Sequence, residues 1–291
     1  MAARDLQSLI IRDIKEIAEM REVEELQKDV WGVADREVFP ALALVPMIEL
    51  GAVLIGAFDG DRIAGFVFGF PGYQPSGDPG AGGRVLLHSD MLAVRPEYRS
   101  RDLGYKLKLA QRERALANGI DTISWTFDPL QSLNAHLNFG KLGVIADRYC
   151  VNYYGQTTSF LHRAGTDRLW VTWLLNSERV LKKIAHRETP SRALANFPAV
   201  VHVGENCEPL TSDYDIGQQA ILIEVPSDIN DLVEEDLELA IRWREATRSR
   251  FTSAIAEGYV VDEFYRVSRK RQMVGVYLLS KKASPSRSND E

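Results

Sequence analysis

Cysteine is almost absent from this chain: Cys150 and Cys207 are the two cysteines among 291 residues. They are too few, and too far apart in sequence, to indicate a disulfide framework or a thiolate metal site, so we expect no metal. Scarce cysteine is also typical of a reducing compartment, and we expect a cytoplasmic protein.

A basic excess and a long apolar run are missing as well. The formal net charge is -6 at pH 7, which argues against nucleic acid as a partner because phosphate binding usually needs a basic face. No run approaches the ~18 apolar residues of a membrane helix. The N-terminal stretch MAARDLQSLIIRDIKEIAEM mixes acidic with apolar residues, unlike a signal peptide. We therefore expect a soluble protein with no membrane partner.

The chain does contain enough apolar residues for a large core. Hydrophobic residues make up 45% and charged residues 26% of the chain, as in an ordinary soluble enzyme. The length suits two domains, which we expect at residues 1–165 and 166–280, followed by a disordered tail over 281–291.

Hydrophobic periodicity predicts the elements of the first domain. Asp59-Gly60-Asp61 indicates a hairpin turn, and the Pro- and Gly-rich stretch 71–83 indicates an exposed loop. Strands are predicted at 8–14, 51–58, 62–70, 84–94 and 120–127, and helices at 14–31, 40–50 and from Leu103 to the C-cap pair Asn118-Gly119.

The second domain is predicted as strand, long helix and hairpin. In the long helix, the pattern Ile241-Arg242-Trp243-Arg244 puts Arg and Trp on adjoining faces. We expect a solvated, salt-bridged face there, with a carboxylate-binding arginine as the alternative. Its elements are a strand at 167–173, a helix-prone linker at 178–195, a strand at 219–225, the helix at 229–257 stopped by Gly258, and strands at 259–268 and 272–280.

One segment carries most of the functional information: Leu86–Leu107, LLHSDMLAVRPEYRSRDLGYKL. An apolar strand ends at Arg95-Pro96, and a basic, glycine-containing turn leads into a helix. The first amides of a helix lack internal partners and carry the positive end of its dipole, which stabilises an anion by roughly 0.3 to 2 kcal/mol. Arg99 and Arg101 add charge there. Taken alone, the turn is also compatible with a solvated helix cap.

Two motifs resemble signatures of the GNAT superfamily of N-acyltransferases. The turn Arg99–Gly104 resembles Arg/Gln-x-x-Gly-x-Gly/Ala, with Asp102 in place of the first glycine. Aspartate tolerates a left-handed backbone better than most residues, while its carboxylate repels a nearby phosphate. The segment Asn134–Val144 is similar to the second signature, an Asn-rich helix that ends in Lys-Leu-Gly-Phe. The resemblance implies an α/β (α+β) fold: a mixed, mostly antiparallel central sheet flanked by helices, plus a smaller C-terminal α+β region.

The resemblance also implies a binding site for an acyl-CoA donor. In the superfamily, two strands splay apart, and the pantetheine arm pairs with the backbone of the first, here Met91–Val94. The donor implied is acetyl-CoA or another acyl-CoA, with succinyl-CoA as an alternative. The residues implied are Leu92, Ala93, Val94, Arg99, Ser100, Arg101, Asp102, Leu103, Gly104, Tyr105, Asn134, Phe139 and Lys141.

His88 and Asp90 are the candidates for proton transfer. They lie two apart on a predicted strand and so share a face, at positions where the superfamily often places a base. His88 suits this role through its ordinary pKa of about 6.5. Asp90 as the base stays open. The structural alternatives are a half-buried histidine bonded to a carbonyl, and a carboxylate paired with Arg84 or Arg95.

The general acid is harder to place. The superfamily commonly uses a tyrosine just ahead of Lys-Leu-Gly, where this chain has Phe139. On the next predicted strand, Tyr149 and Tyr153 share one face and Tyr154 the other. We take Tyr154 as the candidate. Packing is the alternative for these tyrosines, and a thiol of pKa about 8.5 also leaves without an acid.

These motifs together predict an acyl-CoA-dependent N-acyltransferase. It would move an acetyl or succinyl group to the amine of a small molecule, such as a free amino acid. The alternatives are a catalytically decayed acyl-CoA sensor, and an interaction protein that assembles through its C-terminal helix. The sequence leaves the oligomeric state open, with a homodimer as one alternative.

Overall fold

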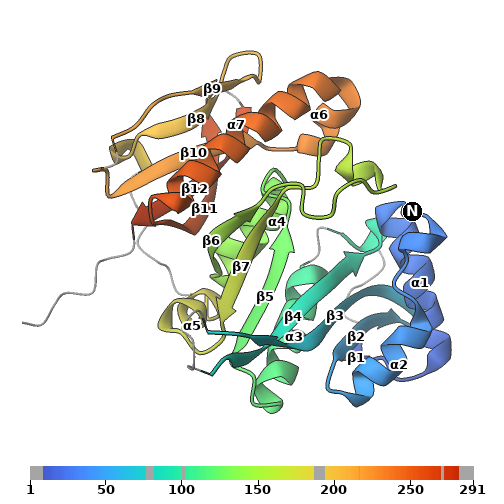
Figure 1. Ribbon diagram of the computed structural model, residues 1–291. Coiled ribbons are helices and arrows are strands. Elements are labelled where there is room, and N and C mark those ends of the chain that lie inside the picture. The colour runs from blue at the N-terminus through green and yellow to red at the C-terminus, as the bar shows by residue number, and fades with distance from the viewer. Residues whose placement is uncertain are drawn as a thin grey trace, which may run out of the picture. The chain divides into compact units, whose positions relative to one another are not determined.

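The computed structural model describes residues 9–76, 82–99, 102–186, 194–215, 217–269 and 272–281. The chain forms two compact units (Figure 1). The first takes the chain up to Thr126 together with 156–163 and 172–181, and the second takes 127–155, 164–171 and the chain from Lys182. This division differs from the predicted boundary after residue 165, because the chain passes between the units several times.

The first unit is a sheet with strand order β1-β2-β3-β4-β5. Neighbours pair antiparallel as far as β4, and β4 pairs parallel with β5. Its strands are β1 (Ile10–Asp13), β2 (Val53–Asp59), β3 (Arg62–Gln74), β4 (Arg84–Val94) and β5 (Thr122–Phe127), and its helices are α1 (Ile17–Trp31), η2 (Asp35–Glu37), α2 (Ala41–Glu49), η3 (Pro96–Tyr98), α3 (Leu103–Ala117) and η5 (Phe160–His162).

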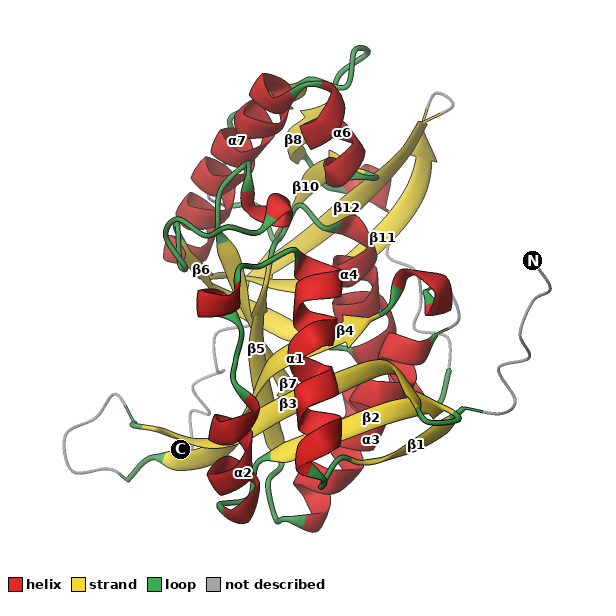
Figure 2. Ribbon diagram, turned by 90° about the vertical axis from the view of Figure 1, so that its right-hand side faces the viewer, coloured by secondary structure: helices red, strands yellow, loops and turns green. Residues whose placement is uncertain are grey.

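Helices cover both faces of this first sheet. Figure 2 shows α1 in front of the strands and α3 behind them. The central strands are accordingly apolar on both sides, and β3 is buried without interruption from Ile63 to Gly69. Leu26 of α1, Leu54 of β2 and Phe66 of β3 lie in one apolar cluster. The core therefore sits directly against the central strands of this sheet.

The β3–β4 hairpin is longer than predicted. Strand β3 continues to Gln74, which pairs with Arg84, so the first part of the expected loop is strand. Pro71 is tolerated there because β2 pairs with β3 only as far as Gly69, which leaves one edge of β3 without a ladder. The rest of that expectation includes residues 77–81, which lie outside the described residues. The Asp59–Asp61 turn is confirmed.

The second unit is a sheet with strand order β6-β11-β12-β10-β8-β9. All of its pairs are antiparallel except β10 with β8. β7 (Arg168–Leu174) and α5 (Glu178–Ile184) are divided between the units. The other elements are α4 (Ser132–Ala135), the π-helical η4 (His136–Leu142), β6 (Ile145–Cys150), η6 (Leu194–Asn196), β8 (Ala199–Val203), β9 (Pro209–Thr211), β10 (Ala220–Pro226), α6 (Ile229–Glu235), α7 (Leu237–Ala256), β11 (Tyr259–Arg269) and β12 (Gln272–Lys281).

The predicted long helix is two helices. Asp236 leaves the helical region with φ -149°, and its side chain accepts a hydrogen bond from the Leu239 amide, which begins α7. Gly258 stops α7 with φ 87°, as predicted. Strands β8 and β9 were not predicted, and most of the expected disordered tail, 282–291, lies outside the described residues.

The predicted fold class is confirmed: the sheets are mixed, mostly antiparallel and flanked by helices. In the part of the chain that the structure describes, no helix combines the length and apolar character of a membrane span.

Candidate functional site

Strands β4 and β5 pair over a short stretch only. Their parallel ladder joins Leu87 to Ile123 and His88 to Ser124. Both strands then continue, and from Ser89 onward β4 keeps its ladder with β3 but forms none with the described residues of β5. Such an edge offers main-chain donors and acceptors to a ligand that carries amides.

A β-bulge lies at the same point. The register of β3 against β4 shifts between Phe68 and Phe70, so that Gly69 faces two residues of β4, Ser89 and Asp90. A Cβ at Gly69 would lie 2.8 Å from a main-chain oxygen of β4, so glycine is required there. The bulge gives a reason for β4 to bend away from β5, because bulges bend the strand that carries them.

His88 and Asp90 share a face, as their spacing predicts. His88 Nε2 lies 4.0 Å from Asp90 Oδ1, and His88 Nδ1 lies 3.4 Å from Ser124 Oγ. The His88 side chain is 17% exposed and the Asp90 side chain 30%. The distance to Asp90 is too long for a hydrogen bond. The site therefore combines a half-buried imidazole with a nearby carboxylate at the end of the ladder.

The electrostatics of this pair differ from the expectation for His88. Burial lowers the pKa of His88 to about 4, and the positive charge of Lys108 is the second, smaller cause. Burial also raises the pKa of Asp90. His88 is therefore a neutral imidazole at neutral pH with a lone pair to offer, and it is a weaker base than a histidine that titrates near pH 6.5.

The turn after β4 has the conformation that the sequence suggests. Asp102, the N-cap of α3, is left-handed with φ 57° and ψ 16°, as a glycine would be. Arg99 is exposed, and its Nε donates to the Val94 carbonyl at 3.2 Å. Ser100 and Arg101 lie outside the described residues.

Arg95, which lies beside the turn, is not available to an anionic ligand. It is 8% exposed, its Nε donates to the Ile63 carbonyl at 2.8 Å, and its Nη1 pairs with Asp29 of α1 at 2.5 Å. The carboxylates of α1 already neutralise it, so Arg95 fixes the end of β4 against that helix.

The other residues of the first unit that are predicted to contact the acyl-CoA donor offer it only main-chain groups. Leu103 and Tyr105 are buried at 3% and 9% exposure, so their side chains face the core and only their amides suit an anion. Gly104 lies between them in the first turn of α3. On β4, Ala93 is buried, while Leu92 and Val94 are half-buried.

Lys108 was not singled out from the sequence. It is 2% exposed, and its Nζ donates to Ser89 Oγ at 2.7 Å, lies 3.4 Å from Gln111 Oε1 and sits 3.7 Å from the centroid of the Trp125 ring. Burial lowers the pKa of Lys108 to about 7. The sequence did hold a sign of this burial. Lys108 lies three residues before Gln111, and Gln111 lies four residues before the buried Ala115, so the three side chains share one face of α3.

The second signature motif lies in the second unit, and its helix is largely π-helical. Asn134 is exposed whereas Asn138, four residues further along, is buried. The reason is that the wider π-helical turn breaks the four-residue repeat of an α-helix. Lys141 is half-buried near the end of this helix.

Phe139 is part of the core of the second unit. It is 0% exposed, and its ring centroid lies 6.1 Å from that of Phe127 and 5.8 Å from that of Tyr277. We therefore correct the expectation of a donor contact: the aromatic neighbours on both sides leave Phe139 no free surface for a ligand.

The predicted strand position of Tyr154 is wrong. β6 ends at Cys150, and Tyr153 and Tyr154 follow in a turn where Asn152 is left-handed with φ 46°. Tyr154 is 46% exposed, and the Arg168 guanidinium carbon lies 5.0 Å from its ring centroid. Asparagine tolerates positive φ, which explains why the strand stops here.

Tyr149 is committed to a buried ion-pair network in the second unit. Its hydroxyl donates to Asp167 Oδ2 at 2.8 Å, and burial together with the Asp167 charge raises its pKa far above the ordinary value. Arg248 of α7 pairs with the same carboxylate, with its Nε 2.7 Å from Oδ2. Tyr149 is thus a structural hydrogen-bond donor.

Arg244 is also structural. The solvated face predicted for the 241–244 pattern is confirmed for the exposed Arg242 and is wrong for Arg244. It is 2% exposed and binds Asp128 through two hydrogen bonds of 2.7 and 2.6 Å, while its Nε donates to the Ala164 carbonyl at 3.1 Å. This face of α7 is buried, as the 0% exposure of the adjacent Trp243 shows. The carboxylate that the arginine binds belongs to the chain itself.

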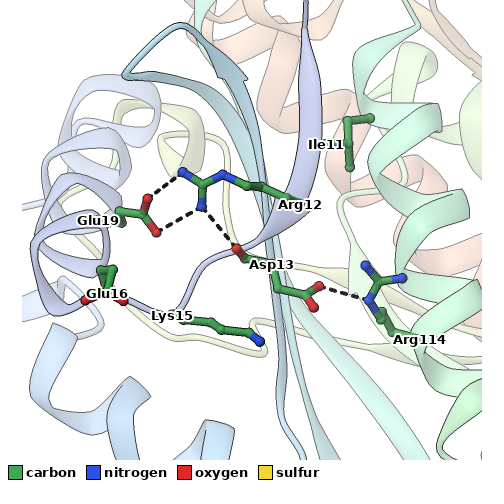
Figure 3. Close-up of a pocket in the computed structure, with 7 residues that line it drawn as sticks. All are labelled: Ile11, Arg12, Asp13, Lys15, Glu16, Glu19 and Arg114. Atoms are coloured by element: carbon green, nitrogen blue, oxygen red, sulfur yellow. Dashed lines mark hydrogen bonds and ion pairs between the residues drawn. The ribbon is translucent and has the colours of Figure 1, made fainter.

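A pocket of about 420 Å³ lies elsewhere on the first unit, between the end of β1, the start of α1 and the last turns of α3 (Figure 3). Four of its charged side chains form two ion pairs: Arg12 Nη2 lies 2.6 Å from Glu19 Oε1, and Arg114 Nε lies 2.9 Å from Asp13 Oδ1. We assign it no chemistry. The described residues bring together no cluster of three or more metal-binding side chains.

Solved structures similar to this chain include three acetyltransferases. An aminoglycoside 6'-acetyltransferase type Ii is 17% identical over 58% of this chain and 99% of its own, with a TM-score of 0.43. The ribosomal-protein-S18-alanine N-acetyltransferase from Escherichia coli is 15% identical over 58% and 95%, with a TM-score of 0.43. An acetyltransferase of the GNAT family from Streptococcus pneumoniae is 18% identical over 57% and 98%, with a TM-score of 0.42. No family model and no curated protein matches the sequence.

Proposed function

We propose that this chain is an acyl-CoA-dependent N-acyltransferase that moves an acetyl or succinyl group to the amine of a small molecule, such as a free amino acid. One observation carries the proposal. The β4–β5 ladder ends at His88 and Ser124, which leaves the β4 edge from Ser89 without a β5 partner, and β4 leads to the left-handed start of α3.

The donor would bind along this edge. The two amides of a pantetheine arm pair with main-chain groups of Ser89–Val94 that have no ladder with the described residues of β5, as an added strand would. The pyrophosphate accepts hydrogen bonds from the first amides of α3, where Arg99 adds positive charge. The motif Arg99–Gly104, which resembles the GNAT signature, supports this placement.

The reaction joins the amine nitrogen to the thioester carbonyl carbon and then breaks the carbon–sulfur bond. Bond formation makes the nitrogen strongly acidic, so a base as weak as His88 accepts its proton at that stage. The sulfur leaves as a thiolate or takes a proton from an acid.

A thiol-release assay tests the proposal. Purified protein is mixed with acetyl-CoA or succinyl-CoA and a panel of amino acids and polyamines, and free CoA is measured over time. Release that requires both donor and amine is the expected result. A chain that binds neither CoA ester in calorimetry contradicts the proposal.

An acyl-CoA sensor is the second candidate. Two observations favour it: the usual tyrosine position holds the buried Phe139, and His88 is a weak base. Tight binding of a CoA ester without thiol release, across the whole amine panel, would identify the sensor.

A further inference from the structure

A buried lysine lies at the place where β4 and β5 separate. The last ladder pair is His88 with Ser124. One residue further along each strand, Ser89 and Trp125 both contact the ammonium of Lys108: its Nζ lies 2.7 Å from Ser89 Oγ and 3.7 Å from the centroid of the Trp125 ring. The lysine thus touches the first unpaired residue of each strand.

The position of this ammonium opposes closure of the two strands. Paired strands lie about 4.8 Å apart, and side chains in register contact each other directly. Here the Lys108 ammonium contacts both side chains, Ser89 Oγ and the Trp125 ring, and so bridges the two strands. Closing the ladder would expel the ammonium from its partners or leave it buried without them, and both are strongly unfavourable.

Gln111, three residues further along α3, lies under the adjacent bulge. It is 0% exposed, and its Oε1 is 3.4 Å from Lys108 Nζ. Its Nε2 has no hydrogen-bond partner among the described residues and would lie 2.8 Å from a Cβ at Gly69. Helix α3 therefore places two buried polar side chains beneath the bulge and the separation, where apolar residues would pack more favourably.

We propose that Lys108 is a positioning residue that wedges β4 and β5 apart and so keeps the β4 edge open for the pantetheine arm of the donor. The inference rests on the proposed function, which supplies the donor. Lys108 acts through Ser89 and Trp125 and does not itself touch the donor. Its role differs from that of the α3 amides, which would hold the pyrophosphate.

The test compares two ligands in calorimetry with Lys108→Met. CoA has the pantetheine arm, whereas adenosine 3',5'-bisphosphate has the nucleotide alone. Loss of two main-chain hydrogen bonds predicts a CoA dissociation constant raised about tenfold. The dissociation constant of the bisphosphate stays unchanged. Ser89→Ala, which removes the acceptor, weakens CoA binding in the same way, and its effect does not add to that of Lys108→Met.

Lys106→Met is the matched control, because Lys106 is an exposed lysine on the same helix. If Lys108→Met acts only by removing positive charge from α3, CoA and adenosine 3',5'-bisphosphate both bind more weakly. That result overturns the inference that Lys108 holds the strands apart. Amide exchange of the free protein gives a readout that needs no ligand: Ser89–Val94 exchange more slowly in Lys108→Met if the strands close, and unchanged exchange overturns the inference. A wild-type chain that binds no CoA refutes the proposed function, while the exchange measurement still decides the wedge.

Discussion

His88 and Ser124 form the last pair of the parallel ladder between β4 and β5, and their side chains meet with Nδ1 3.4 Å from Oγ. The candidate proton acceptor therefore stands at the point where the two strands separate. A thioester that follows the free edge of β4 would end beside this imidazole. Substrate position and proton transfer thus depend on the same local feature of the sheet.

His88→Ala should lower turnover far more than it changes donor affinity. Removing a general base costs about 10²- to 10⁴-fold in rate, whereas the donor binds through main-chain groups that the substitution leaves intact. Steady-state kinetics and calorimetry with CoA measure the two effects. His202→Ala, on β8 of the second unit, is the matched control. Equal losses in kcat and donor affinity would argue against the role of base.

The free energy of unfolding at acidic pH should depend on the protonation of His88. Its pKa is about 4 in the folded chain and about 6.5 when unfolded. In this window the unfolded state binds more protons, so the free energy of unfolding falls as pH drops from about 6.5 to 4. Denaturant titrations of the wild type and His88→Ala measure it. If both variants lose stability equally across this window, His88 is not buried as described.

Asp102→Gly and Asp102→Asn should both tighten donor binding. Each removes a carboxylate from the N-cap of α3, and both glycine and asparagine accept the left-handed φ of 57°. Interactions of charges with a helix terminus are about 0.3–1 kcal/mol, which predicts a roughly two- to fivefold lower dissociation constant for CoA. Calorimetry at low and high salt measures this change. Weaker binding by both variants would show that the carboxylate assists the donor.

Lys108→Met should stabilise the chain at neutral pH. Replacing a buried charge by an apolar side chain of similar size gains about 1–3 kcal/mol in the free energy of unfolding. The pKa of Lys108 is about 7 when folded and about 10.4 when unfolded. Wild-type stability therefore rises with pH between these values, and the advantage of the variant shrinks. Chemical denaturation at pH 6 and pH 10 checks this. A difference that is constant with pH would contradict the burial of the ammonium.

Asp128→Asn should destabilise the chain strongly. The substitution leaves Arg244, which is 2% exposed, without its carboxylate, and breaking a buried pair costs about 3–5 kcal/mol. Asp213→Asn is the control, because Asp213 is a fully exposed partner of Arg250, and such pairs contribute about 0–1 kcal/mol. Urea unfolding curves compare the two. Similar small effects would mean that Arg244 finds other partners.

Local features of this site could be predicted from the sequence. The bounds of β4, the common face of His88 and Asp90 and the left-handed Asp102 follow from strand alternation and from backbone preferences within a few residues. These features are the same in the folded chain as in the prediction because residues close by in the sequence determine them.

Features that depend on distant residues could not be predicted. The bulge opposite Gly69 depends on how β3 meets β4, and the burial of Lys108 depends on Ser89 and Trp125 of two other elements. A lysine in a helix is ordinarily exposed, so the helical spacing of Lys108 to Gln111 and Ala115 is only a weak sign of its burial. Phe139 was misplaced for a similar reason, since its aromatic neighbour Tyr277 is far along the chain.

Amide hydrogen exchange with and without CoA tests directly whether the donor lies along the open edge of β4. CoA is expected to slow exchange at main-chain amides of Ser89–Val94 and at the first amides of α3, while β2 is unaffected. CoA binding that leaves both segments unchanged and protects another part of the chain would contradict this placement of the donor.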